Sequence, residues 1–199
     1  MKLTYIAAGI LALSSSLSAS TIFFGGGGGD LGVSSKIFTN GSISVTATGF
    51  ASSGGALVNL FGKGVAGTGA EDGLGLVNDT LDHEIQGNSF IQLDISGLTG
   101  VIQIAMGSTG GDSWAIFGSA NNGIKGMTQL ASGNNDDGVL VTVTNATNFH
   151  YLDIAAVTNN VLLQELSNTS RTPEPGTFGL LGLGAIGLGL VRRKIRTRS

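Results

Sequence analysis

The densest cluster of side chains able to ligate a metal lies in a polar stretch before a predicted strand. Asp79, Asp82 and Glu84 place three carboxylates within six residues. Ca²⁺ takes about six to eight oxygen ligands, so these carboxylates are candidate calcium ligands. The spacing of an EF-hand is absent, and the alternative interpretation is a solvated acidic loop without a cofactor. The stretch therefore predicts a calcium site at most, with no other cofactor.

Residues for catalysis are sparse. The chain has two histidines, His83 and His150, and no cysteine, and neither H-E-x-x-H nor G-x-S-x-G occurs in it. A triad that uses one of the histidines stays open, because triad residues are brought together only by the fold. Asp112 with Trp114 is a candidate sugar site with the indole as stacking platform; the competing interpretation is a core tryptophan. We predict that the protein is not an enzyme.

The charge distribution separates a body from a tail. Residues 21–170 contain three Lys, no Arg and 12 Asp or Glu, a formal net charge of −9, whereas five basic residues lie among the last eight. A nucleic-acid partner is excluded for the body because phosphates require Lys and Arg contacts. The basic tail follows an apolar run directly, which favours a membrane-flanking role.

The composition predicts β structure. The 199 residues include 34 Gly and only two Pro, and 12% are charged. Apolar and polar residues alternate with a period of two, between turns rich in Gly and Asn. We therefore predict an all-β fold, an antiparallel two-sheet β-sandwich or jelly roll over residues 30–168, after a Gly-rich linker at 21–29. The expected strands lie in the segments 43–48, 57–61, 91–95, 102–106, 114–117, 139–144, 149–154 and 161–166.

The first 20 residues have the three parts of a secretory signal. Lys2 is followed by an apolar stretch from Ile6 to Leu13 and then by small residues from Ser16 to Ser20. An apolar segment this short does not span a bilayer. We predict a signal helix that is cleaved between Ser18 and Ser20, and hence an exported protein.

The other end predicts a membrane anchor. We expect Pro173, Glu174 and Pro175 to form an extended segment that interrupts regular secondary structure. An apolar helix is predicted directly after it at 176–191, and a basic cluster follows the helix. Sixteen helical residues span about 24 Å, slightly less than the bilayer core of about 30 Å. Snorkelling basic side chains and local thinning can cover the difference. The cluster consists of Arg192, Arg193 and Lys194.

The order of these parts over residues 172–198 resembles the PEP-CTERM sorting domain. The resemblance implies recognition by an exosortase, a transient inner-membrane anchor, removal of the helix near Pro173-Glu174-Pro175, and delivery to the cell surface or extracellular matrix. An ordinary C-terminal transmembrane anchor is the alternative. The expected function is structural or adhesive, in association with exopolysaccharide or a biofilm. The alternative function is a carbohydrate-binding module or a glycan-active enzyme.

Overall fold

The computed structural model describes residues 16–26, 28–64, 71–79 and 81–172. The apolar part of the predicted signal sequence and the predicted anchor helix at 176–191 lie outside these residues. No helix in the described ranges is long and apolar enough to cross a membrane. Residues 19–170 form one compact unit, which we call the body.

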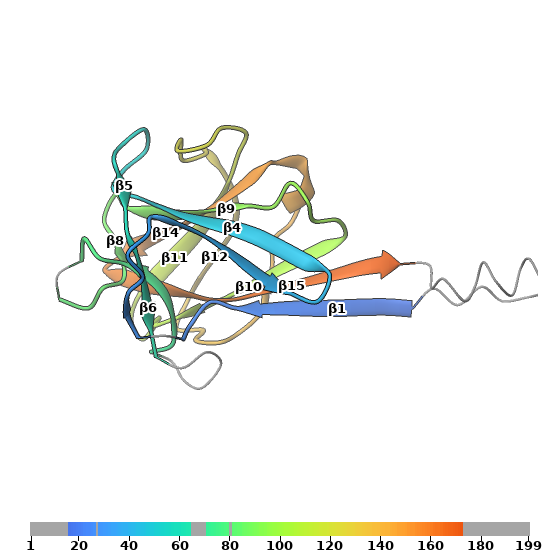
Figure 1. The fold of residues 1–199 in the computed structure, drawn as a ribbon, viewed down its shortest axis with the longest axis horizontal. Coiled ribbons are helices and arrows are strands. Elements are labelled where there is room, and N and C mark those ends of the chain that lie inside the picture. Colours follow the sequence, from blue (N-terminus) through green and yellow to red (C-terminus); the bar gives the residue numbers. More distant parts are fainter. Residues whose placement is uncertain (1–15, 27, 65–70, 80, 173–199) are drawn as a thin grey trace, which may run out of the picture. The chain divides into compact units, whose positions relative to one another are not determined.

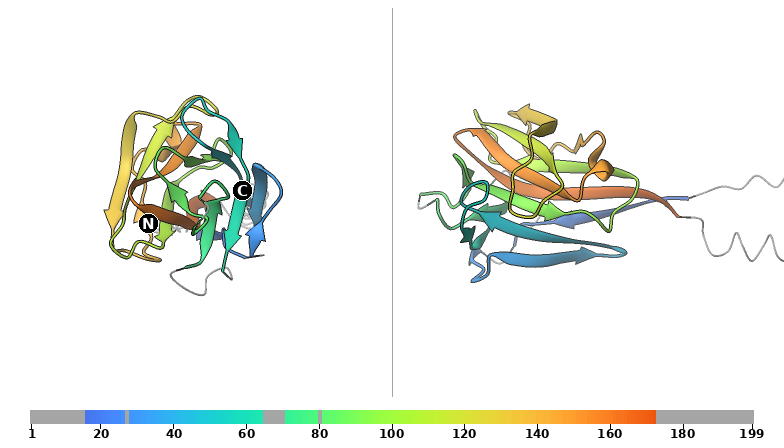
Figure 2. Two further views of the ribbon diagram at one scale, coloured as in Figure 1. Left: turned by 90° about the vertical axis from the view of Figure 1, so that its left-hand side faces the viewer. Right: turned by 90° about the horizontal axis from the view of Figure 1, so that it is seen from above.

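The body is built from two β-sheets (Figures 1 and 2). Sheet A contains β1 (Ser16–Phe23), β2 (Gly29–Asp30), β6 (Leu60–Lys63), β7 (Gly73–Leu76), β8 (Ile85–Gln86), β10 (Val101–Gly107), β13 (Val141–Thr142) and β15 (Asn160–Thr172). Its strand order is β13-β10-β15-β7-β6-β2, and β1 and β8 also pair with β15.

Sheet B contains β3 (Ser35–Asn40), β4 (Ile43–Phe50), β5 (Leu57–Val58), β9 (Phe90–Asp94), β11 (Ser113–Ser119), β12 (Thr128–Asn134) and β14 (Tyr151–Thr158). Its order is β12-β11-β14-β9-β4-β3, and β5 pairs with β4. The main pairings in both sheets, such as β10 with β15 and β4 with β9, are antiparallel. A short 3₁₀ turn, η1 (Ala146–Asn148), precedes β14.

The alternation of residue types places the core between the sheets. On β4, Ile43, Val45 and Ala47 are buried, and the Ser and Thr between them face outward. Ile91 and Leu93 of β9 contribute to the same core cluster. Sheet A supplies Leu60, Leu74, Leu76, Ile102, Ile104, Met106, Val161, Leu163 and Leu166. The predicted all-β, two-sheet antiparallel architecture is confirmed.

The domain boundary predicted at residue 30 is too late. Ile22 and Phe24 are 2% and 1% exposed, and Phe24 packs edge-on against Phe38 with 5.0 Å between the ring centroids. The backbone N–H of Phe24 donates to the carbonyl of Gln164. Residues 21–24 are therefore part of the sandwich and not of a linker. The side chains of Ile22 and Phe24 fill the core, although a glycine run begins directly after Phe24.

A second, smaller apolar cluster lies on the outer face of sheet B. Phe50 and Phe90 stack there with 5.1 Å between their ring centroids, and Ala155 and Phe117 pack beside them. The loop of residues 120–127, between β11 and β12, folds over this cluster. Gly123 of the loop lies against the Phe50 ring with a φ of 75°, a left-handed conformation in which a side chain would be strained. This loop positions the site described next.

Candidate functional site

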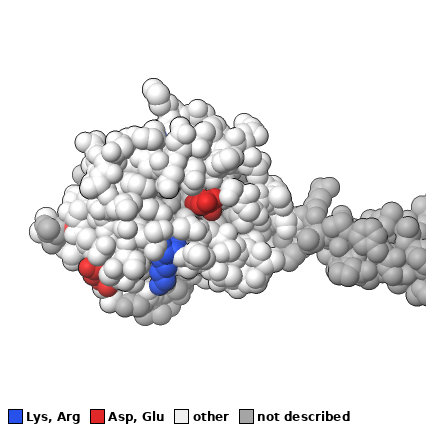
Figure 3. Space-filling model, turned by 45° about the horizontal axis from the view of Figure 1, so that its top comes forward, with Lys and Arg blue, Asp and Glu red and all other residues white. Residues whose placement is uncertain are grey.

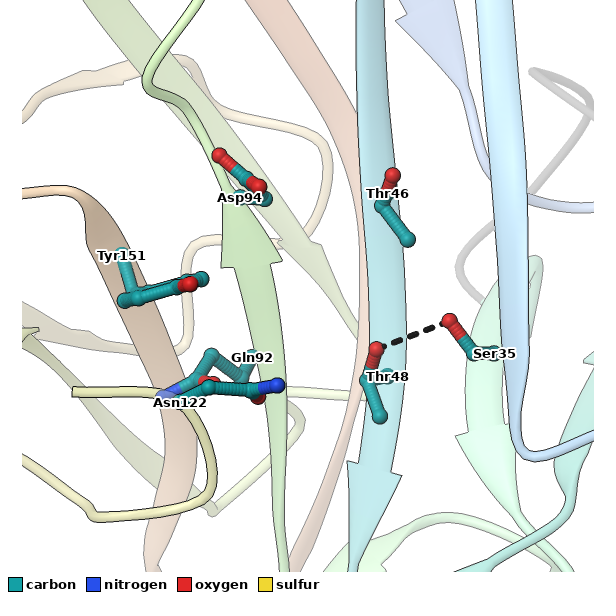
Figure 4. A pocket seen from close by; sticks show the side chains of 7 residues that line it. All are labelled: Ser35, Thr46, Thr48, Gln92, Asp94, Asn122 and Tyr151. Atoms are coloured by element: carbon teal, nitrogen blue, oxygen red, sulfur yellow. Dashed lines mark hydrogen bonds between the residues drawn. The ribbon is translucent and has the colours of Figure 1, made fainter.

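A polar hollow of about 150 Å³ lies on the outer face of sheet B beside the 120–127 loop (Figure 4). We call it the sheet B hollow. Strands β3, β4, β9 and β14 supply six of its lining residues, and the loop supplies the seventh. The lining consists of Ser35, Thr46, Thr48, Gln92, Asp94, Asn122 and Tyr151.

The register of the strands explains why these side chains meet. Thr46 on β4 is paired with Asp94 on β9, and Asp94 is paired with Tyr151 on β14. Neighbouring strands lie about 4.8 Å apart, and paired residues point to the same face. The three side chains therefore form a row across three strands. A second row runs beside it, from Ser35 through Thr48 to Gln92.

A buried pair beneath the loop fixes one wall of the hollow. Gln92 is 1% exposed, and its Nε2 donates to Oδ1 of Asp153 at 2.8 Å and to the carbonyl of Asn121 at 3.2 Å. The backbone N–H of Gly123 donates to Oε1 of Gln92 at 2.9 Å. Asp153 in turn accepts from the backbone N–H of Gly126 at 2.7 Å. The loop is thus held at three points by two side chains of the sheet.

Burial determines the ionisation of the carboxyl in this pair. Removal from water raises the pKa of Asp153 to about 6, although the bonds from Gly126 and Gln92 and the nearby Lys125 favour its charged form. The folded protein therefore binds a proton more tightly than the unfolded chain, whose carboxyl titrates near 3.8. The contribution of this group to stability is complete below about pH 4 and is lost as the pH rises through about 6.

We expect the pH dependence of stability to change in Asp153→Asn. Two pKa units correspond to about 3 kcal/mol, an upper limit if the site relaxes. The free energy of unfolding of the wild type relative to this variant should thus fall by up to this amount between pH 4 and pH 7. Urea unfolding of the body at both values measures it. A difference that is the same at both pH values would contradict the assignment.

The three predicted calcium ligands have separate roles in the structure. Asp79 is buried and accepts from the backbone N–H groups of Leu81 and Glu84, at 3.1 and 3.2 Å, so it holds the turn together. Asp82 is exposed, and its Oδ2 lies 3.4 Å from the amide of Asn160. No group of three or more Asp, Glu, His or Cys able to hold a metal occurs in the described part of the chain.

Glu84 has a cation of the protein as its partner. Lys63 Nζ lies 2.5 Å from Glu84 Oε1 and 2.6 Å from Glu71 Oε2. Burial raises the pKa of Glu84, against the opposing effect of Lys63. The pKa of Lys63 is also raised, because the bonds to both glutamates outweigh its own desolvation. Lys63, one of only three lysines in residues 21–170, thus supplies the counter-charge to both glutamates.

We therefore expect calcium to leave the stability of the body unchanged. A weak extracellular site would add about 0.4–1.4 kcal/mol at millimolar Ca²⁺, which raises the melting temperature by about 1–5 °C. Melting curves in EDTA and in millimolar Ca²⁺ should coincide. A midpoint higher by about 2 °C or more in Ca²⁺ would restore the calcium interpretation.

The structure places the tryptophan in the interior of the sandwich. Trp114 is 1% exposed and belongs to the core cluster. Its Nε1 donates to Oδ1 of Asp136 at 2.8 Å, and its ring lies against Gly133. Trp114 is among the residues that line a hollow of about 330 Å³, together with others from β11, β12 and β14. Asp112, its predicted partner, accepts a hydrogen bond from Asn159 instead. Because only 1% of Trp114 is exposed, its burial favours the competing interpretation of a core tryptophan over a sugar site on its ring.

Neither histidine lines the sheet B hollow, although the His150 ring centroid lies 6.3 Å from that of Tyr151, a lining residue. His83 stacks on Phe61 with 4.1 Å between the ring centroids and has a φ of 59°. Its carbonyl accepts from the backbone N–H of Leu76. His150 is exposed, and its carbonyl accepts from the backbone N–H of Ile95. Both residues thus take part in the backbone pairing of turns.

None of the site residues predicted from the sequence lines the sheet B hollow. Thr46, Thr48, Gln92 and Asp94 stand at the outward positions of two predicted strands, which was a usable signal. Nothing local indicated that these strands are neighbours or that Asn122 folds back over them. Tyr151 lies in a third predicted strand, 149–154, whose place in the sheet was equally open.

The fold and the hollow define a two-sheet antiparallel β-sandwich with a polar recess on one outer face. Residues 171–194 match the PEP-CTERM protein-sorting motif. The match includes Pro173-Glu174-Pro175 and the basic cluster of Arg192, Arg193 and Lys194, which lie beyond the described residues. No curated protein and no solved structure matches the chain.

The chain is thus an exported protein that carries a PEP-CTERM signal for membrane-associated sorting by an exosortase. The resemblance noted in the sequence is confirmed. The matched residues lie in the tail, so they do not define the role of the body.

Proposed function

We propose that the body is a non-catalytic, adhesive component of the cell surface or extracellular matrix, associated with exopolysaccharide. The observation that carries this proposal is the junction between body and tail. Strand β15 ends at Thr172, and the sorting tripeptide begins at Pro173. A C-terminus formed by processing near residue 175 would therefore follow the last strand of the sandwich by only a few residues of sequence.

The strand at this junction is anchored in the middle of its sheet. β15 has 13 residues and pairs with β10 from Val101↔Thr169 to Gly107↔Leu162. It also pairs with β1, β7 and β8 (Figure 1). Its apolar residues Leu163 and Leu166 are fully buried. A load applied at the C-terminus therefore reaches many hydrogen bonds and the core, as an adhesive module requires.

The surface of the body suits a hydrated polysaccharide environment. Most of the face seen in Figure 3 is uncharged, and the charged residues of the body are mainly acidic. Net negative charge keeps a module soluble and prevents nonspecific binding to anionic polymers. These features support a matrix protein more than a nucleic-acid binder.

This proposal is tested by deleting the gene for this protein from an exosortase-bearing host that makes exopolysaccharide. We expect the wild-type protein to co-fractionate with the extracted matrix, and the deletion strain to lose cohesion of cells with that matrix. Complementation with the full chain should restore it. Protein found only free in the medium, together with unchanged cohesion after deletion, would contradict the proposal.

A further inference from the structure

The sheet B hollow presents polar groups that the fold itself leaves unused. The hydroxyls of Thr46 and Tyr151 and the amide of Asn122 make no hydrogen bond to the described part of the chain. Asp94 accepts from the N–H and hydroxyl of Ser96 through Oδ1, at 3.0 and 2.6 Å, which leaves Oδ2 open. These groups offer donors and acceptors within one recess.

The chemistry of the lining selects the ligand class. Asp94 is the one charged residue among the seven, and no Lys, Arg or His lines the recess. An anionic ligand would therefore meet a carboxylate without a counter-charge. A calcium ion needs about six to eight oxygen ligands, more than one carboxylate and scattered hydroxyls provide. Because the other six lining residues are uncharged donors and acceptors, the lining favours a neutral ligand rich in hydroxyls, which can donate to Asp94 and accept from Asn122.

The arrangement in Figure 4 fits such a ligand lying across the strands. Tyr151 and Asn122 lie on one side of β9, and Thr46, Thr48 and Ser35 lie on the other. Thr48 and Ser35 are joined by a hydrogen bond of 2.9 Å. Tyr has an apolar ring with a polar tip, and Ser and Asn give adaptable hydrogen bonds at low entropic cost. The row Thr46–Asp94–Tyr151 thus combines a ring with donors and acceptors at the spacing of the strands.

The recess is also rigid where a loop contributes to it. Gln92 binds the carbonyl of Asn121 and the N–H of Gly123, the two residues that flank Asn122. Asp153, which is paired with Gln92 on the neighbouring strand β14, accepts a hydrogen bond from the Gln92 amide and so fixes its orientation. A site whose lining is fixed before binding loses less conformational entropy when the ligand arrives. The buried pair therefore acts as a positioning device for Asn122.

We propose that the sheet B hollow binds a segment of a neutral polysaccharide, with Asp94, Asn122, Thr46 and Tyr151 as its contacts. This inference rests on the adhesive function proposed above and gives it a ligand class and a site. It also moves the carbohydrate contact from Trp114 to the opposite, outer face of sheet B.

The test measures binding of the full chain, purified in detergent, to an array of neutral and acidic oligosaccharides and to soluble dextran and alginate. We expect binding to neutral members of the panel and none to alginate, a polyuronate. Thr46→Val and Asn122→Ala should each weaken that binding about 2- to 10-fold, the value of one neutral hydrogen bond. Asp94→Asn should weaken it about tenfold or more, because a charged acceptor is lost while Oδ1 still caps Ser96.

The controls separate loss of the site from loss of the fold. Thr144→Val makes the same chemical change in a turn after β13 and should bind like the wild type. Trp114 is the single tryptophan and is buried, so an unchanged emission spectrum shows that each variant is folded. Binding of neutral glycans that survives in all hollow variants would overturn the hollow but leave the adhesive function standing. Preference for acidic glycans, or binding to none, would overturn the neutral-ligand assignment.

Discussion

Replacing Pro173, Glu174 and Pro175 together by alanine should remove most of the protein from the cell surface. Proline fixes φ and disfavours helical conformation, whereas alanine is a strong helix former, so the substitution would change the backbone preference of the tripeptide. A processing enzyme that reads an extended segment then loses its substrate. Cell fractionation with an antibody to the body measures the result, and we expect the triple variant to accumulate in the inner membrane.

A matched change in the same tail serves as the control for this experiment. Thr197→Ala lies beyond the matched residues 171–194 and should be delivered like the wild type. Delivery of the triple variant at the wild-type level would contradict the role of the tripeptide. The ordinary transmembrane-anchor alternative predicts that outcome, because an anchor depends on the apolar helix and the basic cluster alone.

Trp114→Ala should cause the largest loss of stability of any single substitution considered for the body. Removal of a buried tryptophan costs about 3–5 kcal/mol through lost apolar contacts and the cavity left behind. This is a large part of the roughly 5–15 kcal/mol that stabilises a typical domain. Urea unfolding of the body, followed by circular dichroism because the fluorophore is gone, measures the change.

Two further variants divide this loss into its parts. Trp114→Phe keeps most of the packing but removes the bond to Asp136, so it should cost clearly less than the alanine variant. Gly133→Ala should also destabilise, because an added Cβ would lie 2.6 Å from the indole ring. If Trp114→Ala unfolds at the wild-type urea concentration, the indole is not part of the core.

The period-two segments predicted the inner strands because their burial depends on local residue type. β4, β9, β10 and β11 all lie where apolar residues alternate or run together. The edge strands β3 and β12 were missed, since Ser35–Asn40 and Thr128–Asn134 are mostly exposed and contain no fully buried residue. Of the strand predicted over 139–144, the structure contains only the two residues of β13, Val141–Thr142. Val139 at the start of the predicted strand is 54% exposed.

The hollow and its support depend on contacts that no local pattern encodes. Asp94 and Asp153 both stand at outward positions of sheet B, yet Asp94 is half-buried and Asp153 is fully buried. The difference arises because the 120–127 loop returns over Asp153, a contact between residues about 27 positions apart. In the same way, Lys63 reaches Glu84 only because β6 and the turn before β8 are adjacent. The sorting signal was readable because it acts as a linear segment.

The most direct test of the account is the intact mass of the protein released from the surface of an exosortase-bearing host. Cleavage between Ser18 and Ser20 would leave the described core intact, since the compact unit begins at Ala19. We predict a chain that starts at Ala19 or Ser20 and lacks the residues beyond about 175, plus the mass of whatever is joined to its new C-terminus. A surface protein that retains the apolar helix and the basic cluster Arg192-Arg193-Lys194 would contradict exosortase processing and leave a plain membrane anchor.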